Sequence, residues 1–270
     1  WRRALPGVLH SLRSQRFDIA LDLQRIIKSG LFCMASSSRR RVGFDRARCK
    51  ELTWMLPFER IPAADPGAHM ALQYLEFASH LGAHPGEIRW DIPVSGGIPG
   101  GIPEAYVVLN IGATKGANRW TAEGFAALAE HLSHHRSLPS VLTGGPEDTG
   151  MAHRIASLAR CPVIDMTGRT TIPELKEVIA GSRAVVSCDT GPMHLAVALG
   201  KKVLALMGPS DPRRTGPLKG KVTRLDLDCM PCNRRHCDDP RCMRGISADM
   251  VIRDLDGLLD DPSGFQHPAA

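Results

Sequence analysis

The feature of this sequence that most constrains its fold is a pattern that repeats between residues 106 and 227. Each repeat has a short apolar run, a glycine-containing turn and an amphipathic segment of helical length. This alternation is typical of β-α-β units, which build a parallel sheet covered by helices on both faces. The apolar runs are short enough for strands buried on both faces. They comprise residues 106–111, 140–142, 163–164, 184–188 and 202–207.

Local signals fix the starts of two helices in this region. Thr121 can cap a helix that begins at residue 122, and Trp120 and Phe125 occupy the positions of a hydrophobic staple. Thr171 and Glu174 have the spacing of a capping box. Both segments are therefore predicted to be helices with defined N-termini.

The first third of the chain has the pattern of a second α/β unit. A Gly/Pro tract at residues 96–103 cannot sustain helix or sheet, so we expect a linker there. The predicted domains are residues 1–100 and residues 101–270, the second with a cysteine-rich loop at 229–242 and a C-terminal helix. The chain starts at Trp1 in a helical segment, so the opening strand of the first unit and the loop after it are expected to precede this sequence. The elements predicted in the first unit are a helix to residue 16, a strand at 17–23, a helix at 25–35, a strand at 41–44 and a helix at 69–81.

Composition excludes several classes of protein. No run of eighteen apolar residues occurs, which excludes a membrane-spanning helix and leaves only peripheral membrane contact. The formal charge of +6 favours anionic partners. Only 5% of residues are aromatic and none interleave with the arginine clusters, which argues against nucleic acid as a partner. Four cysteines stand alone in apolar or helical contexts, as is usual for reduced thiols in the cytosol. They are Cys33, Cys49, Cys161 and Cys188.

Ligands of open parallel sheets bind beyond the carboxyl ends of the strands, where loops run into helix N-termini. Unpaired N–H groups at helix N-termini favour phosphate, so the natural ligand is a nucleotide diphosphate. The chain has neither a P-loop nor a dinucleotide fingerprint, which argues against kinases and dehydrogenases. The alternative is that the glycines of these loops only permit tight turns. The loops, each with glycine, are residues 110–114, 143–148, 166–168, 189–194 and 207–212.

The loop at residues 189–194 is the most informative of these. Asp189 could accept hydrogen bonds from sugar hydroxyls, and the N–H groups of Thr190 and Gly191 could donate to phosphate. His194 falls on the first turn of the following helix. In the alternative interpretation, Asp189 or Thr190 only caps that helix and His194 packs in the core.

A cysteine cluster is the second candidate site. Four thiolates suit zinc or an iron–sulfur cluster, although the spacing is not that of a standard zinc ribbon. A structural metal, free thiols and disulfides are all open as alternatives. The cluster comprises Cys229, Cys232, Cys237 and Cys242.

Around Asp189 the sequence resembles the family 9 glycosyltransferases, the heptosyltransferases of lipopolysaccharide assembly. Their D-[ST]-G-x-x-H-x-A-x-A-L signature is matched by residues 189–199. Four further blocks agree in order and spacing, at residues 18–30, 40–51, 112–125 and 208–217. The resemblance implies an α/β fold of GT-B type, with two Rossmann-like domains and parallel sheets. The acceptor would bind to the first domain and ADP-heptose to the second.

The resemblance also implies roles for individual residues. Thr114, Lys115 and Arg119 would lie near the diphosphate, although the family usually has lysine where this chain has Asn118. Glu147 or Asp148 would bond the ribose. On the donor side the implied residues are Thr114, Lys115, Arg119, Gly145, Glu147, Asp148, Asp189, Thr190, Gly191 and His194. On the acceptor side they are Lys28, Arg40 and Arg48, for which a solvated basic face is the alternative.

The implied reaction is an inverting displacement that moves heptose from ADP-heptose to the inner core of lipopolysaccharide, on Kdo-lipid A. A carboxylate removes the acceptor proton, and cationic groups and helix dipoles stabilise the departing diphosphate. The family's base is an aspartate of the first βα loop, expected to precede Trp1, so no catalytic base is assigned and Asp18 and Asp22 are interpreted as structural. No cofactor is required, and the enzyme would be cytoplasmic, near the inner face of the inner membrane. The alternatives are a GT-B enzyme that uses another nucleotide sugar for a different surface glycan, or a non-catalytic nucleotide-sugar-binding module.

Overall fold

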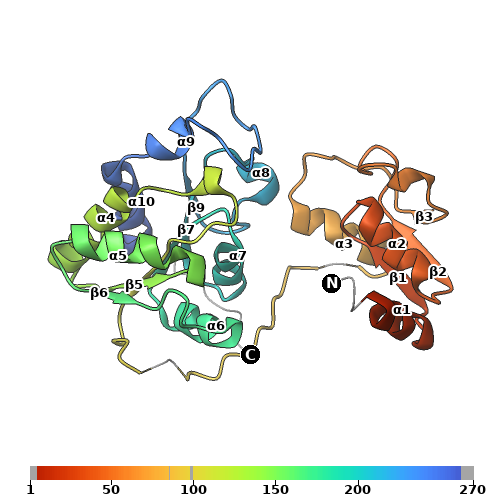
Figure 1. The fold of residues 1–270 in the computed structure, drawn as a ribbon, viewed down its shortest axis with the longest axis horizontal. Coiled ribbons are helices and arrows are strands. Elements are labelled where there is room, and N and C mark those ends of the chain that lie inside the picture. The colour runs from red at the N-terminus through yellow and green to blue at the C-terminus, as the bar shows by residue number, and fades with distance from the viewer. Residues whose placement is uncertain (1–4, 85, 98–99, 263–270) are drawn as a thin grey trace. The chain divides into compact units, whose positions relative to one another are not determined.

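The structure is a computed structural model that describes residues 5–84, 86–97 and 100–262 (Figure 1). The chain divides into two compact units, Trp1–Ile88 and Arg89–Ala270. The predicted start at Trp1 lies outside the described residues, as do residues 98–99 of the predicted linker.

The first unit is a small parallel sheet packed with helices. Its strand order is β1-β2-β3, and β1 pairs with β2 from Ile19 opposite Arg40 to Asp22 opposite Gly43. A small core forms where the edge of the Phe77 ring meets Phe44, with 4.8 Å between ring centroids. The predicted elements of this unit are confirmed, whereas β3 is only two residues long and has no apolar run to predict it. The elements are α1 (Leu5–Ser14), β1 (Ile19–Asp22), α2 (Ile27–Ala35), β2 (Arg40–Gly43), η1 (Thr53–Met55), β3 (Glu59–Arg60) and α3 (Met70–His80).

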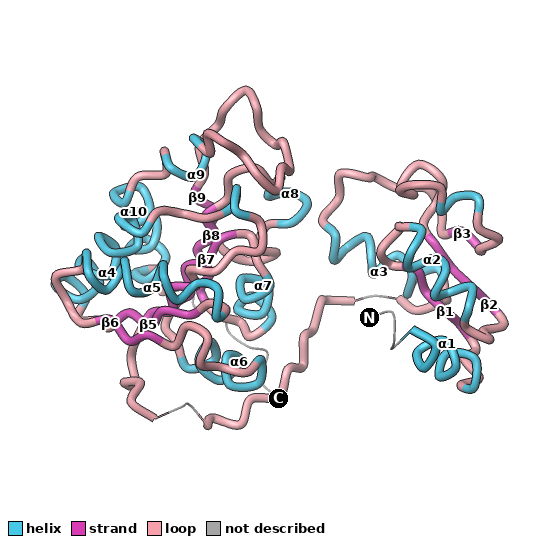
Figure 2. The backbone as a smooth tube through the Cα atoms, in the orientation of Figure 1, coloured by secondary structure: helices cyan, strands magenta, loops and turns pink. Residues whose placement is uncertain are grey.

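The second unit contains a six-stranded, fully parallel sheet with the order β6-β5-β4-β7-β8-β9 (Figure 2). All five predicted strands are present, and the short β9 adds an edge that no apolar run predicted. The strands are β4 (Val107–Asn110), β5 (Ser140–Thr143), β6 (Val163–Asp165), β7 (Ala184–Cys188), β8 (Lys202–Leu206) and β9 (Lys221–Thr223).

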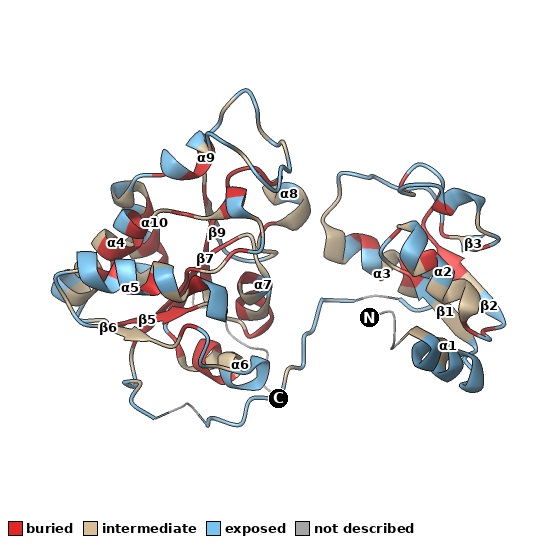
Figure 3. Cartoon of the chain, viewed as in Figure 1, coloured by how far each residue is buried: buried red, intermediate tan, exposed pale blue. Residues whose placement is uncertain are grey.

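Helices cover both faces of this sheet, so its central strands β5, β4, β7 and β8 are buried on both sides, whereas the edge strands β6 and β9 are partly exposed (Figure 3). Val107 and Leu109 of β4 point into the core shared with α4 (Ala122–Arg136), α5 (Thr149–Leu158) and α10 (Ala248–Asp260). Val108 between them points into the core shared with α6 (Ile172–Gly181) and α7 (Gly191–Ala198). The helices and short turns are η2 (Gly116–Asn118), α4 (Ala122–Arg136), η3 (Pro146–Asp148), α5 (Thr149–Leu158), α6 (Ile172–Gly181), α7 (Gly191–Ala198), α8 (Pro212–Thr215), α9 (Arg241–Arg244) and α10 (Ala248–Asp260).

The predicted helix starts are confirmed. The Thr121 side chain accepts a hydrogen bond from the Gly124 amide at 3.1 Å, and the Trp120 and Phe125 rings meet with 4.8 Å between centroids. At α6, the Thr171 amide donates to the carboxylate of Glu174 at 2.7 Å and its hydroxyl accepts from the Glu174 amide at 3.4 Å. The hydrogen bond from the Thr171 amide lowers the pKa of Glu174.

The segment before the predicted linker is bound to α6. The Glu177 carboxylate accepts from the amide of Ser95 at 3.1 Å, from its hydroxyl at 3.0 Å, and from the amide of Gly96 at 2.9 Å. The boundary between the two compact units lies between Ile88 and Arg89. Residues 89–96 therefore belong with the second unit.

The order of the strands places a crevice at the carboxyl ends of β4 and β7. The chain runs from β4 outward through β5 and β6, and then returns to build β7, β8 and β9 on the other side. Asn110 at the end of β4 lies opposite Thr143 of β5 on one side and Ser187 of β7 on the other. Loops leaving neighbouring strands in opposite directions open a crevice, which is where ligands of doubly wound sheets bind.

Candidate functional site

A pocket of about 260 Å³ lies at this crevice. Four loops and the first turns of α6 and α7 form its wall. Its lining residues are Asn110, Gly112, Ala113, Thr114, Gly144, Gly145, Glu147, Asp148, Thr170, Thr171, Ile172, Leu175, Thr190, Gly191 and Pro192. The volume is close to the lower end of small-molecule sites, and the wall is rich in backbone and hydroxyl groups.

Asn110 organises the base of the pocket. Its side-chain amide is buried and donates to the hydroxyl of Ser187 at 3.0 Å, to the hydroxyl of Thr190 at 3.1 Å and to the carbonyl of Gly112 at 3.3 Å. Its carbonyl oxygen accepts from the Thr143 hydroxyl at 3.4 Å. One residue thus joins the ends of three neighbouring strands to the loops that follow them.

The N-terminus of α7 opens into the pocket without a side-chain cap. Thr190 is its N-cap residue, but the Thr190 hydroxyl bonds to Asn110, to Ser187 and to the carbonyl of Cys188 instead of to the helix amides. A Cβ atom built on Gly191 would meet nothing within 4 Å. The backbone at Gly191 therefore faces open space, where the positive end of the helix dipole favours an anion.

Asp148 fixes the glycine loop on the opposite wall. It is 2% exposed and its Oδ2 accepts from the Gly145 amide at 2.9 Å. A Cβ atom on Gly112 would lie 2.5 Å from the same oxygen, so the close approach of these loops requires glycine. Its Oδ1 lies 2.5 Å from Nη1 of Arg119. The Asp148 carboxylate is therefore already bonded to protein groups. Of the two acids, only the exposed carboxylate of Glu147 is left to accept hydrogen bonds from a ribose.

Six of the ten predicted donor-side residues line the pocket. They are Thr114, Gly145, Glu147, Asp148, Thr190 and Gly191. Lys115 and Asp189 adjoin lining residues in sequence, Arg119 pairs with the lining residue Asp148, and His194 lies two residues beyond the lining residue Pro192. Asp189 is half-buried and accepts from the Thr215 hydroxyl at 3.5 Å. His194 is exposed on α7, so the alternative that it packs in the core is wrong.

Sequence reasoning missed the wall contributed by α6. Thr170, Thr171, Ile172 and Leu175 line the pocket, and Ile172 is 79% exposed. An apolar side chain at a helix start, next to a glycine loop, was the available signal. Asn110 was expected only as part of the loop at residues 110–114, without a role of its own, although a polar residue at the end of an apolar strand marks a position at the mouth of the sheet.

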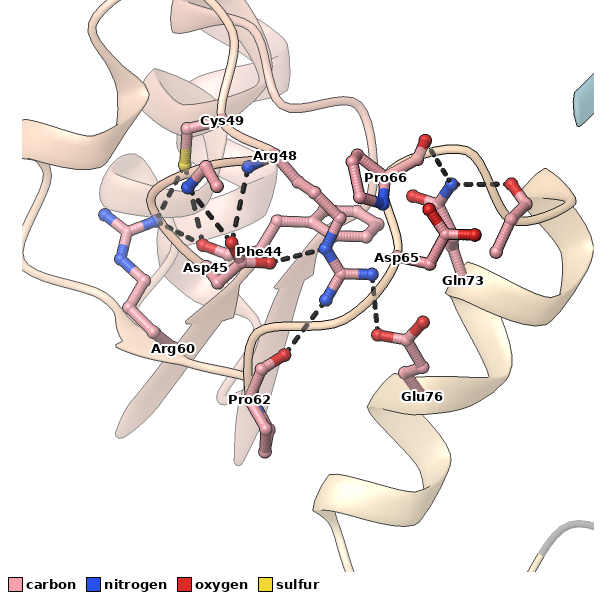
Figure 4. A network of polar contacts seen from close by, with 12 residues as sticks. Phe44, Asp45, Arg48, Cys49, Arg60, Pro62, Asp65, Pro66, Gln73 and Glu76 are labelled. Atoms are coloured by element: carbon pink, nitrogen blue, oxygen red, sulfur yellow. Dashed lines mark hydrogen bonds and ion pairs between the residues drawn. The ribbon is translucent and has the colours of Figure 1, made fainter.

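The three predicted acceptor-side residues lie in the first unit in different surroundings. Lys28 is exposed on α2, and Arg40 is exposed on β2, where it pairs with Glu59 at 2.9 Å. The Arg48 side chain is fully buried, pairs with Asp45, and lies 2.6 Å from Glu76 and 3.0 Å from the carbonyl of Pro62 (Figure 4). Its guanidinium is enclosed by protein groups and does not reach the surface, so its position does not support acceptor contact.

The cysteine loop does not form a metal site as placed. Within residues 5–84, 86–97 and 100–262, no group of three or more His, Cys, Asp or Glu side chains could hold a metal ion. Cys229 is exposed and Cys242 is buried. Burial, followed by the nearby thiols of Cys232, Cys229 and Cys237, raises the pKa of Cys242. The four thiols thus lie close enough to influence one another electrostatically, but they are not arranged to bind a metal ion together.

The family model for glycosyltransferase family 9 (heptosyltransferase) matches residues 7–242. The chain belongs to glycosyltransferase family 9. The resemblance noted around Asp189 is therefore confirmed, and the match extends through most of both units of this family 9 protein.

Individual relatives agree with this assignment. Lipopolysaccharide core heptosyltransferase OpsX of Haemophilus influenzae is 23% identical over 80% of this chain and 64% of its own length. Lipooligosaccharide heptosyltransferase 2 of Campylobacter jejuni is 26% identical over 92% of this chain and 78% of its own length. The chain therefore spans just under two thirds of the Haemophilus protein.

Solved structures confirm the fold. The E. coli ADP-heptose lipopolysaccharide heptosyltransferase II superposes with a TM-score of 0.73 at 22% identity, over 93% of this chain and 79% of that one. The expected GT-B class, with two Rossmann-like parallel-sheet units, is thus confirmed for this family 9 glycosyltransferase. In the part of the chain that the structure describes, every helix is too short or too polar to cross a membrane.

Proposed function

We propose that this family 9 glycosyltransferase moves heptose from ADP-heptose to the inner core of lipopolysaccharide. The observation that carries the proposal is the uncapped N-terminus of α7, which opens beside the Gly145 loop into the pocket at the strand-order reversal. A diphosphate there would accept hydrogen bonds from the Gly191 backbone and from the Thr114 hydroxyl. Glu147 would bond the ribose hydroxyls.

The departing ADP carries the charge that the site must stabilise. The dipole of α7 and the cations of Lys115 and Arg119 supply positive potential close to that position. Asp189 and His194 would contact the sugar, since both adjoin the α7 terminus. Asp148 is paired and Glu147 is assigned to the ribose, so we assign neither carboxylate as the catalytic base.

Calorimetric titration with ADP-heptose, ADP and a UDP-sugar tests the donor. We expect ADP-heptose to bind at least about tenfold more tightly than the UDP-sugar, because a pocket shaped for one base leaves polar groups unpaired with another. Equal affinities would favour a different nucleotide sugar.

We propose that the reaction itself needs no metal. The pocket wall offers backbone amides and hydroxyls, and Arg119 lies beside it, paired with the lining residue Asp148. Together with the dipole of α7, these groups would supply the positive potential that transfer requires. Metal analysis of protein purified under reducing conditions tests the separate question of the cysteine loop. We expect no stoichiometric zinc or iron, whereas one equivalent that is lost on Cys229→Ser would establish a structural metal site.

We also propose that the enzyme works at the cytoplasmic face of the inner membrane, because the proposed acceptor is anchored there by lipid A. Cell fractionation should find it in the cytoplasm and, at low salt, partly with inner membranes.

A further inference from the structure

Exposed apolar side chains gather on one part of the first unit. They come from the first turns of α2 and from the segment around η1, and comprise Ile27, Leu31, Leu52, Trp54 and Met55. Leu31, Leu52 and Met55 are between 58% and 63% exposed. We name these five residues the η1 surface. Isolated exposed apolar residues are ordinary, but several on two adjoining segments are typical of a contact surface.

The two segments that form the η1 surface are held side by side. The Ile27 amide donates to the Glu51 carboxylate at 2.6 Å, and the Lys50 amide donates to the Arg25 carbonyl at 3.0 Å. A Cβ atom on Gly30 would lie only 2.3 Å from Leu56, so the chain packs closely against α2 here. The surface is therefore part of the fold and not a loose loop.

Cations surround these apolar side chains. Lys28, Arg46 and Lys50 are exposed, and the Arg46 guanidinium lies over the Trp54 ring, 4.4 Å from its centroid. Two acids lie on the same segments: Glu51 accepts from the Ile27 amide, and Asp45 pairs with buried Arg48. Residues 1–88 contain 13 Lys and Arg against 8 Asp and Glu, a net charge of +5 out of the chain's +6.

We infer that the η1 surface docks the enzyme on an anionic lipid bilayer. Trp, Leu and Met side chains would enter the boundary between head groups and acyl chains, while Lys28, Arg46 and Lys50 contact lipid phosphates. The inference rests on the proposed function in one respect: an acceptor anchored by lipid A brings the enzyme to a membrane surface. It goes further by assigning the contact to a defined set of side chains and to anionic lipid.

Vesicle co-sedimentation tests the inference. Vesicles of phosphatidylcholine alone are compared with vesicles that also contain phosphatidylglycerol, using the full chain at low and high salt. We expect binding only to the anionic vesicles, weakened by salt because exposed charges are screened. The variant Arg46→Gln/Lys50→Gln/Trp54→Ser/Met55→Ser should bind about tenfold less than the parent chain. Leu158→Ala/Arg160→Gln on exposed positions of the second unit is the matched control and should bind as the parent does.

Two further measurements distinguish lipid binding from misfolding of a variant and from self-association of the chain. Anionic vesicles should shift the tryptophan fluorescence of the parent chain to the blue, and Trp54→Phe should abolish that shift while its circular dichroism spectrum is unchanged. Binding of the four-residue variant equal to that of the parent would overturn the inference. An absence of vesicle binding would also overturn it. Self-association in ultracentrifugation that the variant removes would then identify a second copy of the chain as the occupant. ADP-heptose titrations without vesicles report on the proposed function independently, so the two proposals can fail separately.

Discussion

Arg119 and Asp148 form an ion pair beside the nucleotide pocket, with 2.5 Å between Nη1 and Oδ1. The Asp148 side chain is almost fully buried and the Arg119 side chain is about one third exposed. Asp148 also holds the amide of Gly145, so one carboxylate positions both a cation and a glycine loop at the pocket wall. The pair explains why an acid expected to bond ribose is turned toward the protein.

Asp148→Asn should destabilise the second unit by about 1–3 kcal/mol, because Arg119 and the Gly145 amide lose the charge of the buried carboxylate that accepts from both. It should also weaken ADP binding, since Arg119 and the Gly145 loop lose their common support. Thermal unfolding and calorimetry measure the two effects. Asp226→Asn is the matched control: Asp226 pairs with Arg224 at 3.1 Å but is 94% exposed, and its loss should change stability by less than about 1 kcal/mol. Equal effects of the two changes would contradict the assigned role of Asp148.

Thr190→Val should lower the affinity for ADP by about tenfold, because the buried amide of Asn110 loses a hydrogen-bond partner next to the α7 terminus. Thr190→Ser keeps the hydroxyl and should bind nearly as the parent chain does. Calorimetric titration of the two variants separates the hydroxyl from the methyl group. If Thr190→Val binds ADP as tightly as Thr190→Ser does, the hydrogen bonds of Asn110 do not position the α7 N-terminus for ADP.

Arg48→Met should destabilise the first unit by about 3–5 kcal/mol, since Asp45 would lose a buried partner and Glu76 a partly buried one. Arg40→Met removes an exposed pair with Glu59 and should cost less than about 1 kcal/mol. Urea unfolding compares them. A normal stability of Arg48→Met with a raised KM for the acceptor would restore the role first expected for Arg48.

Glu177→Gln should destabilise the second unit at neutral pH and have little effect near pH 2. The hydrogen bond from Lys176, followed by that from the Ser95 amide, lowers the pKa of Glu177 from 4.5 to about 2. A lowered carboxyl pKa stabilises the folded state above the unfolded value, and this stabilisation is lost as the pH falls from about 4.5 toward about 2. Unfolding curves of parent and variant should therefore converge over that range. A difference that is independent of pH would show that the charge of Glu177 is not what binds residues 95–96.

The sequence predicted the strands of the second unit because apolar runs buried on both faces are unambiguous when glycine turns bound them. It predicted the α4 and α6 starts because Thr121 and Thr171 cap through contacts a few residues away. The edge strands β3 and β9 escaped prediction because their residues, Glu59–Arg60 and Lys221–Thr223, are mostly polar and form no apolar run.

The sequence predicted which edge of the sheet and which loops form the pocket, but not which side chain plays which role there. Nothing in the spacing of Glu147 and Asp148 reveals which carboxylate turns inward, because the pairing with Arg119 depends on packing between loops 29 residues apart in the chain. Arg48 escaped for the same reason: its partner Glu76 lies 28 residues away on α3. Side chains that meet only through the tertiary fold leave no local pattern.

The central claim is that the open N-terminus of α7 binds the pyrophosphate of an activated sugar, and Gly191→Val tests it most directly. A side chain at Gly191 meets no protein atom within 4 Å of its Cβ, so the variant should fold while it fills the space reserved for the anion. Gly150→Val, at an equally open position in the first turn of α5, is the control. Calorimetry should show that Gly191→Val loses at least about tenfold in ADP affinity while Gly150→Val binds as the parent chain does. Unchanged ADP affinity in folded Gly191→Val would contradict the account.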